Sequence, residues 1–290
     1  MKYLFIINPS AGKGKPLNYI EKIKKLFAGE EYYIELTKRK GHATEIAREY
    51  SAKEKYIIYA IGGDGTVNEV VNGIIGTTSL LVIIPAGSGN DFIRSIYPNY
   101  KNREFLKKYN EEEISYVDVV KINNTHFINI ASVGLDAEVV YNATKLKKSK
   151  YIKGDLSYIL SLIKTTFKRK TINIIVKIDK KEVWNGEILL ICMANGRYYG
   201  GGVKIMPVAK INDEKIDVCI IKNISIFEII KIVPSLIKST HLKEKAITTY
   251  KGCEISIKST ELLRVNIDGE IVEEKELNAK IIPKAIKLLI

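Results

Sequence analysis

Residues 56–73 read YIIYAIGGDGTVNEVVNG, a continuous apolar run that passes through a glycine-rich turn into a helical pattern. The run Tyr56–Ile61 is typical of a strand buried on both faces. From Val67 onward the apolar residues recur at the three- and four-residue spacing of an amphipathic helix. Glycines let backbone N–H groups come close to an anion, and the start of a helix adds partial positive charge. This stretch therefore predicts a strand–turn–helix unit with an anion site at the turn.

The same alternation of strands and helices fills the first hundred residues. Strands are predicted over Tyr3–Ile7, Tyr32–Leu36 and Leu80–Ile84, and helical faces over 17–27, 43–50 and 67–75. Strands joined through helices of this length run parallel, because the crossover requires the helix. The sequence thus predicts a doubly wound parallel α/β domain at the N-terminus.

The sequence pattern changes beyond residue 117, where short strand-like runs dominate. Such a pattern predicts a second, β-rich domain of the sandwich kind with a few inserted helices. The predicted strands are Val117–Ile122, Phe127–Ile130, Ile172–Ile178, Val183–Ala194, Ile216–Ile221, Cys253–Ile257 and Leu262–Ile267, and the predicted helices are Val139–Leu146, Leu156–Phe167 and Ile226–Ile237.

Length and composition narrow the class of protein. A chain of 290 residues favours two domains. No apolar run is long enough for a transmembrane helix and the N-terminus does not resemble a signal peptide, so we expect a cytoplasmic location. The cysteines and histidines lack metal-ligand spacing, and the thiols are expected to be reduced core residues. A net charge of +13 favours an anionic partner or simply a lysine-coated surface. With no helix-turn-helix, zinc or basic-zipper pattern, nucleic acid is not expected.

Polar and glycine residues gather in the turns that follow the predicted parallel strands, which is where such sheets bind ligands. In the turn after Tyr56–Ile61, Asp64 stands among glycines, and a carboxylate beside a phosphate makes chemical sense if Mg²⁺ bridges the two. The alternative is a tight turn in which Asp64 caps the next helix. Thr66 and Glu69 fit the capping-box pattern at that helix start.

Two further turns have the same character. Residues 8–14 read NPSAGKG, which is neither a Walker A loop nor a dinucleotide fingerprint. Residues 87–94 read GSGNDFIR. In that turn Ser88 can donate to phosphate, Asp91 can join a metal shell and Arg94 can balance charge. The competing interpretation is that Asn90 and Asp91 merely start a helix.

The motifs GGDGTVNEVVNG, PAGSGNDFIR, ANGRYYGGG and NIDGE, in this order, resemble those of the diacylglycerol kinase catalytic-domain family. Within that family the likeness is to soluble bacterial lipid kinases related to sphingosine and ceramide kinases. It covers essentially the whole chain. GGDGT alone is shared with NAD kinases, whereas its combination with GSGNDF and NGRYYGGG is far more specific.

The resemblance implies an ATP-binding domain over 1–117, with 279–290 returning to it as a final strand pair, and a lipid-substrate domain over 118–278. It implies a general base at Asp268 or Glu270 in NIDGE. It also implies a structural Mg²⁺ held by Asp213 with main-chain carbonyls of Lys210 and Lys215, although Glu214 replaces the family's usual glycine. The implied ATP contacts, with Asp64 also catalytic, are Asn8, Ser10, Gly12, Thr37, Gly62, Gly63, Asp64, Gly65, Thr66, Val67, Asn68 and Ser88.

The chemistry of phosphoryl transfer agrees with these residues, because it needs alignment and charge neutralisation more than covalent machinery. Asp64 and Asp91 would place Mg²⁺ against the phosphates, and a carboxylate would accept the proton of the attacking hydroxyl. Asp268 and Glu270 alternate along a predicted strand and would share one face, and Glu270 is the favoured base. The alternative for this pair is a solvated Asp-Gly turn. Residues 195–202 are expected to line the acceptor site or to contact the nucleotide cleft, and the alternative is a β-bulge loop whose tyrosines simply pack.

The sequence therefore predicts an ATP-dependent lipid kinase that phosphorylates a lipid hydroxyl, with diacylglycerol as the favoured acceptor and phosphatidic acid as product. The alternatives are an NAD kinase-like enzyme or a non-catalytic lipid-binding regulator. Apolar residues flanked by lysines over 145–170 predict a helix that docks on an anionic membrane, or a solvated helix. The acceptor lipid and the oligomeric state, including a homodimer, stay open.

Overall fold

In a computed structural model of the chain, residues 1–135 and 172–290 are described. They form two compact units. The first comprises Met1–Val119, Ile211–Glu214 and Ile282–Ile290, and the second comprises Val120–Lys210 and Lys215–Ile281. The helices predicted over Val139–Leu146 and Leu156–Phe167 lie outside the described residues.

The first unit is built on a parallel sheet with the strand order β13-β4-β3-β1-β2. Every residue of β3 is buried, which explains the unbroken apolar run in the sequence, whereas the edge strand β2 is half-exposed. The strand bounds are β1 Lys2–Ile7, β2 Glu31–Leu36, β3 Tyr56–Gly62 and β4 Leu80–Pro85, with β13 entering at its C-terminal end.

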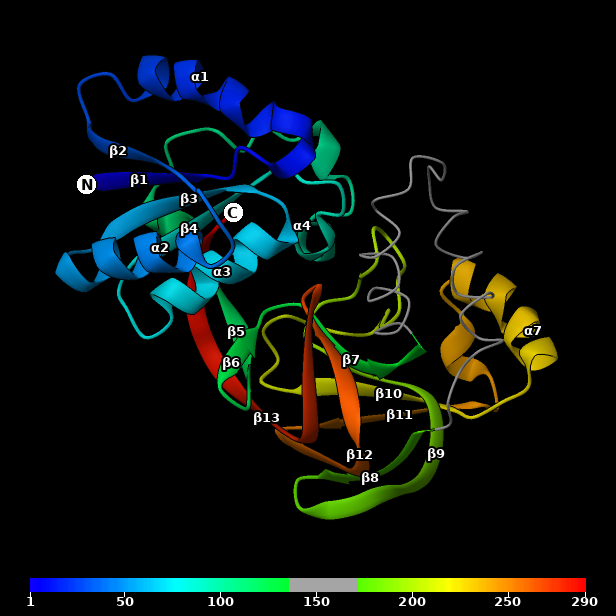
Figure 1. The fold of residues 1–290 in the computed structure, drawn as a ribbon. Helices are drawn as coiled ribbons and strands as arrows, with labels where there is room; N and C mark the ends of the chain where they lie inside the picture. Colours follow the sequence, from blue (N-terminus) through cyan, green and yellow to red (C-terminus); the bar gives the residue numbers. More distant parts are fainter. Residues whose placement is uncertain (136–171) are drawn as a thin grey trace. The chain divides into compact units, whose positions relative to one another are not determined.

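Helices cover both faces of this sheet, with α1 on one face and α2 and α3 on the other (Figure 1). Ile23 of α1 and the following Phe27 pack in one core cluster with Phe5 and Tyr59. The inward face of α3 carries the buried valines that the helical spacing predicts. The helices are α1 Tyr19–Leu26, α2 His42–Lys53, α3 Asp64–Ile74 and α4 Asp91–Ile96, with 3-10 segments over Ala11–Asn18, Tyr100–Asn102 and Glu111–Glu113.

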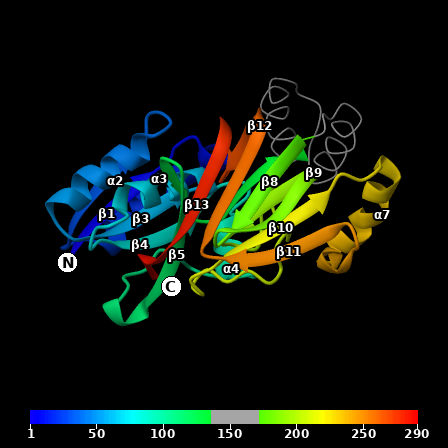
Figure 2. The ribbon, with the colours of Figure 1, turned by 90° about the horizontal axis from the view of Figure 1, so that it is seen from below.

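The second unit is an antiparallel β structure with the strand order β11-β10-β9-β7-β12-β13, in which β8 pairs with both β9 and β12. Figure 2 shows β9, β10 and β11 side by side. Alternate residues of β8 are buried in the main core cluster of this unit, as expected for a strand with one face on the core. The strands are β5 Ile114–Ile122, which begins in the first unit, β6 Thr125–Phe127, β7 Ile130–Gly134, β8 Ile172–Ile178, β9 Lys181–Ala194, β10 Ile216–Lys222, β11 Ile247–Gly252, β12 Glu254–Ile267 and β13 Glu270–Leu289.

The doubly wound α/β domain followed by a β-rich domain is confirmed, but several strand predictions are wrong. Phe127–Ile130 is not one strand, because β6 ends at Phe127 and β7 begins at Ile130, and the N–H groups of Ile128 and Asn129 between them donate to Asp268. The two strands predicted over 253–267 are one strand, β12, which pairs with β13 on both sides of a register shift between Lys258 and Leu263. The final strand pair predicted over 279–290 is the end of the single strand β13. The sequence analysis also missed β11, whose apolar residues are too few to stand out.

One helix of the second unit, α7, has the bounds Ile226–Ile237 predicted from its spacing. Its N-cap Ser225 and Glu228 form a capping box, with the Glu228 N–H donating to Ser225 Oγ at 3.3 Å. A 3-10 turn over His241–Lys243 follows it. None of the helices in the described ranges is long and apolar enough to cross a bilayer.

Candidate functional site

Three strand-to-helix turns of the first unit meet through their glycines. A Cβ atom on Gly87 would overlap the backbone of Gly63, so the turns after β3 and β4 touch at residues without side chains. A Cβ on Gly12 would overlap the carbonyl oxygen of Ala86, which ties in the turn after β1. Gly12 also has a φ of 51°, a value that glycine adopts at little cost. The turns predicted to share one sheet edge do so, and only glycine allows this approach.

Asp64 lies in the first turn of α3 and faces the turn after β4. The Phe92 N–H donates to its Oδ1 at 3.1 Å. A Cβ placed on Gly89 would lie 2.8 Å from Asp64 Oδ2 and 3.4 Å from Asp91 Oδ2. The carboxylates of Asp64 and Asp91 therefore reach the same small space, and the absent side chain of Gly89 keeps that space open. Burial raises the pKa of Asp64, against the opposing effect of the backbone N–H groups around Phe92.

Asp91 is the buried member of this pair, with 5% of its surface exposed. Its neighbour Arg94 places Nε 3.8 Å from Asp91 Oδ1 and donates from Nη2 to the Gly89 carbonyl oxygen at 3.1 Å. The guanidinium thus compensates part of the negative charge that the two carboxylates bring together. The sequence analysis assigned Arg94 this role. Two carboxylates, one nearby cation and an open backbone suit a divalent cation with its phosphates.

Asn8 and Thr66 connect the turns after β1 and β3. Asn8 Nδ2 donates to Thr66 Oγ1 at 3.0 Å, and Asn8 Oδ1 accepts the Ser10 N–H at 3.0 Å. The hydroxyl of Thr66 therefore joins α3 to the turn after β1. The N-cap of α3 is Gly63, which has no side-chain cap, so the predicted Thr66–Glu69 capping box is wrong.

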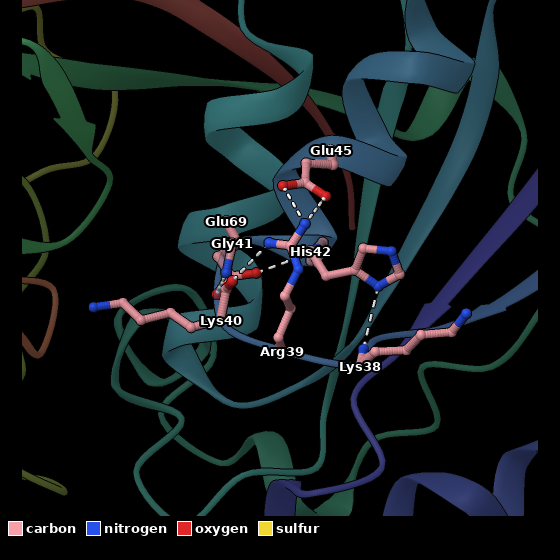
Figure 3. Close-up of polar contacts among 8 residues, drawn as sticks. Lys38, Arg39, Lys40, Gly41, His42, Glu45 and Glu69 are labelled. Atoms are coloured by element: carbon pink, nitrogen blue, oxygen red, sulfur yellow. Dashed lines mark hydrogen bonds and ion pairs between the residues drawn. The ribbon is translucent and has the colours of Figure 1, made fainter.

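Glu69 instead organises the loop before α2, as Figure 3 shows. Its carboxylate accepts the N–H groups of Gly41 at 2.9 Å and Ala43 at 3.0 Å, and its backbone oxygen accepts the Thr44 hydroxyl at 2.8 Å. These contacts fix the N-terminus of α2, the helix that follows the segment beginning at Thr37. Sequence reasoning missed this role, because the partners of Glu69 are 25 to 28 residues away along the chain.

The other predicted nucleotide contacts differ in what their side chains can reach. Thr37 follows β2, and its N–H donates to the Ile7 carbonyl oxygen at 2.9 Å, beside the end of β1. Val67 is buried on the inward face of α3, so its side chain belongs to the core. Asn68 Oδ1 accepts from Asn72 on the next turn of the helix at 3.2 Å. Ser88 is exposed at the tip of its turn.

Asp268 and Glu270 do not alternate along a strand, and that prediction is wrong. Asp268 has a φ of 46° and Gly269 a φ of 94°, so the two residues form the tight turn between β12 and β13. Glu270 is the first residue of β13. Positive φ at both central residues is the signature of the type I′ hairpin turn, which favours Asp-Gly.

The Asp268 carboxylate has a structural role in the second unit. Oδ2 accepts the Ile128 N–H at 2.9 Å, and Oδ1 accepts those of Asn129 at 3.2 Å and Ile130 at 2.8 Å. Asn129 connects this turn to the loop over 195–202, since its Nδ2 donates to the Tyr198 carbonyl oxygen at 2.8 Å. Its own carbonyl oxygen accepts two N–H groups from the start of that loop. Asp268 is thus a positioning residue for the glycine-rich loop.

In the turn that carries Asp213, Glu214 has the left-handed backbone conformation that the sequence led us to expect, which is unfavourable for glutamate. Glu214 has a φ of 61°, where a glycine would cost less. Its N–H donates to Asp118 Oδ2 at 2.7 Å, and the Lys284 N–H donates to Asp118 Oδ1 at 2.7 Å. Asp118 is fully buried and joins this turn to β13. The sequence signal for this role was a lone carboxylate in Val117–Ile122, a run that is apolar apart from Asp118 and Lys121.

No group of three or more histidine, cysteine or carboxylate side chains is arranged for a metal ion in the described ranges. A site made of Asp213 and the backbone carbonyls of Lys210 and Lys215 has only one such side chain and remains a prediction. The Lys215 ammonium itself lies 3.1 Å from Cys253 Sγ.

Comparison with known proteins agrees with this architecture. Residues 2–122 match the diacylglycerol kinase catalytic domain, and residues 129–290 match the YegS C-terminal NAD kinase beta sandwich-like domain. The diacylglycerol kinase of Bacillus subtilis (strain 168) is 30% identical over 274 residues, which cover 91% of this chain and 88% of that protein.

Solved structures extend the comparison. A crystal structure of a diacylglycerol kinase from Bacillus anthracis has a TM-score of 0.79 at 29% identity and covers 99% of this chain and 96% of its own. An NAD kinase from Archaeoglobus fulgidus, solved with ATP, shares the fold alone, at 12% identity and a TM-score of 0.53 over 100% of this chain and 94% of its own.

The chain belongs to the diacylglycerol kinase catalytic-domain family. It is a lipid kinase, and membership of a kinase family makes ATP its phosphoryl donor. The expected resemblance is confirmed.

Proposed function

We propose that this kinase transfers the γ-phosphoryl group of ATP to the hydroxyl of diacylglycerol and so makes phosphatidic acid. One observation supports the proposed ATP site above all others. The carboxylates of Asp64 and Asp91 reach the same space beside Gly89, at a point where glycine turns meet. The acceptor is proposed from the relatives, one of which is named diacylglycerol kinase.

The glycine turns are suited to a triphosphate. Their backbone N–H groups can approach phosphate oxygens without a side chain in the way, and the N-terminus of α3 adds partial positive charge. Asn8, Ser10, Gly12 and Thr37 line the ends of the neighbouring strands and are proposed to complete the nucleotide contacts. Glu69 keeps the Thr37 segment in place through the N-terminus of α2.

Asp64 and Asp91 are the residues proposed to hold Mg²⁺. When bound, Mg²⁺ neutralises the charge that the phosphates share in the transition state. Burial raises the pKa of Asp64, which means that the ionised carboxylate is destabilised in the fold, and a bound cation would offset this cost.

Glu270 is proposed as the general base. In this role its carboxylate takes the proton of the lipid hydroxyl, the hydroxyl oxygen bonds to the γ-phosphorus, and the bond to the β–γ bridging oxygen breaks to release ADP. Asp268 is less suited, because its oxygens already accept the N–H groups of residues 128–130.

A donor and acceptor assay tests the acceptor directly. The protein is incubated with radiolabelled ATP and Mg²⁺ against mixed micelles of 1,2-diacylglycerol, sphingosine or ceramide, and against NAD. We expect label in phosphatidic acid at a rate at least tenfold above every other acceptor. Preferential labelling of a sphingoid base or of NAD would replace diacylglycerol as substrate, and no labelled product with any acceptor would contradict the proposal.

The base assignment is tested by Glu270→Gln, with Glu274→Gln on the same strand as matched control. Removing a general base lowers kcat by about 100-fold or more. The KM for ATP should change by less than threefold, because Glu270 is not among the proposed nucleotide contacts. Equal loss in both variants, or full activity of Glu270→Gln, would show that Glu270 is not the base.

A further inference from the structure

Helix α7, Ile226–Ile237, is apolar on two opposite sides, although one side would suffice to hold it. Ile232 and Leu236 pack against the core cluster formed by β9, β10 and neighbouring segments. These contacts explain why the side of α7 that faces the core is apolar. The helix nevertheless contains no buried residue.

The outward side chains form one stripe. Phe227, Ile230, Pro234 and Ile237 follow each other at three- and four-residue intervals, so they share one face of the helix. The exposed fractions are 74% for Phe227, 49% for Ile230 and 69% for Ile237. Phe227 and Ile237 are the two most exposed large hydrophobic side chains in the described residues. We call these four residues the α7 stripe.

Cations border the α7 stripe. Lys231 and Lys238 are exposed and lie four residues after Phe227 and Pro234, along one edge of the stripe. Between Lys222 and Lys245 the sequence has five lysines and two glutamates. The acid on the helix, Glu228, is bound in the capping box, and its hydrogen bond to Ser225 lowers its pKa. An apolar stripe edged with lysines matches the boundary between acyl chains and anionic headgroups, where long cationic side chains extend to the phosphates.

We propose that the α7 stripe inserts into the interface of an anionic bilayer and docks the β-rich unit on the membrane. At 12 residues, or about 18 Å, the helix is suited to lie in the interface and too short to span it. The net charge of +13 adds long-range attraction to such a surface. The purpose of this docking rests on the proposed function, since a diacylglycerol acceptor stays in the membrane, but the docking itself needs neither ATP nor turnover.

Vesicle binding of the full-length chain tests the proposal. Wild-type protein is co-sedimented with vesicles of phosphatidylcholine and phosphatidylglycerol at 3:1 and compared with Phe227→Ser/Ile237→Ser. The matched control is Leu262→Ser, because Leu262 is 55% exposed on β12 in the same unit. We expect the double variant to bind at least tenfold more weakly and the control within twofold of wild type, with unchanged circular dichroism in both. Equal binding by the double variant and wild type would overturn the proposal.

A second binding measurement tests the lysines that border the α7 stripe. Lys231→Gln and Lys238→Gln should each weaken binding about fivefold at low salt, and the difference should shrink at 0.5 M salt. Glu228 is left unchanged so that the helix cap stays intact. Equally tight binding of wild type to pure phosphatidylcholine would overturn the anionic part of the proposal.

A fluorescent reporter identifies the occupant of the stripe. Trp184 is the single tryptophan of the chain, so Trp184→Phe/Phe227→Trp places the one indole on α7. We expect emission typical of an exposed indole, quenched by iodide, and a blue shift when vesicles are added. An indole already shielded without vesicles would overturn the proposal. Sedimentation equilibrium would then distinguish a second copy of the chain, which gives a dimer, from a covering segment of the same chain.

These outcomes are separate from those of the proposed function. If no lipid is phosphorylated but the α7 stripe still governs vesicle binding, the docking surface stands without the diacylglycerol assignment. If diacylglycerol is phosphorylated while Phe227→Ser/Ile237→Ser binds vesicles as wild type does, the kinase assignment stands without this surface.

Discussion

The chain contains an Asp-Gly pair in each unit, and the two pairs behave differently. Asp64-Gly65 begins helix α3, where the carboxylate receives the Phe92 N–H and turns its other oxygen toward the space beside Gly89. Asp268-Gly269 forms a hairpin turn, where the carboxylate receives the N–H groups of residues 128–130. In sequence both pairs look like a catalytic carboxylate beside a flexible residue.

The two Asp-Gly pairs differ in the groups that surround the second oxygen of the aspartate carboxylate. Both oxygens of Asp268 accept backbone N–H groups of residues 128–130, whereas Oδ2 of Asp64 lies beside Gly89 in the space that the Asp91 carboxylate also reaches. A carboxylate whose hydrogen-bond capacity is filled by backbone is a structural anchor. One that shares an open space with a second carboxylate is suited to bind a cation. The predictions below probe this contrast.

The largest effect is expected for turnover of Asp64→Asn. The amide keeps the size of the side chain and an acceptor for the Phe92 N–H but removes the negative charge. We expect kcat to fall by about 1,000-fold, the order of loss found when one transition-state charge contact is removed. Steady-state kinetics with the preferred lipid measures it, and wild-type circular dichroism is the control for folding. Turnover within tenfold of wild type would remove Asp64 from the catalytic site.

Asp268→Ala should instead act on stability. It leaves several N–H groups of the 128–130 turn without their carboxylate acceptor and loses the aspartate that tolerates positive φ. We expect the free energy of unfolding to fall by about 3 kcal/mol in urea titrations. Asp268→Asn keeps an acceptor and should lose about half as much. A fully stable Asp268→Asn with 1,000-fold lower kcat would reverse our assignment and make Asp268 catalytic.

The pH dependence of stability gives a smaller effect of known sign. Burial raises the pKa of Asp64 in the folded chain above its ordinary value of 3.8, so the folded state binds a proton at a pH where the unfolded state does not. Asp64 therefore costs stability above its folded pKa, and this cost disappears as the pH falls toward 3.8. Metal-free Asp64→Asn should be more stable than wild type at pH 7, and the two should converge in acid. Urea titrations between pH 7 and 4 measure this, and a less stable variant at pH 7 would show that the charge is compensated.

Glu214→Gly should produce the smallest change. Asp268 and Glu214 both have positive φ, but aspartate tolerates it better than the longer glutamate. Glycine should raise the free energy of unfolding by about 0.5 kcal/mol, after its greater entropy in the unfolded chain is counted. Glu214→Ala, which keeps the strain and loses the distant ion pair with Lys284, is the control and should gain nothing. A gain by alanine equal to that by glycine would attribute the effect to the charge.

Much of the first unit could be predicted because its signals are local. A strand buried on both faces must be apolar at every position, as β3 is, and its crossover helix must repeat at helical spacing, as α3 does. The positions of the glycine turns then follow from the rule that parallel strands end at the same edge. Helix α7 was predicted to its last residue for the same reason.

The second unit was harder because antiparallel strands are defined by their partners. One strand was predicted over Phe127–Ile130, yet the N–H groups of Ile128 and Asn129 donate to Asp268, 140 and 139 residues away, and β7 begins only at Ile130. The interruption predicted within β12 corresponds to a register shift between Lys258 and Leu263, and pairing with β13 on both sides of it makes β12 a single strand. The roles of Asp118 and Glu69 were missed for a similar reason, since each carboxylate serves backbone groups that are distant in sequence.

The sequence by itself determined the alternation of strands and helices, the edge at which the turns meet and the residues that could carry phosphoryl-transfer chemistry. These follow from spacing, burial and side-chain type, which act within a few residues. The tertiary structure alone decided which carboxylates are taken up by backbone N–H groups, which ones share the space beside Gly89, and which side of α7 is left exposed. Hydrogen bonds and burial between segments depend on distances that the order of residues does not contain.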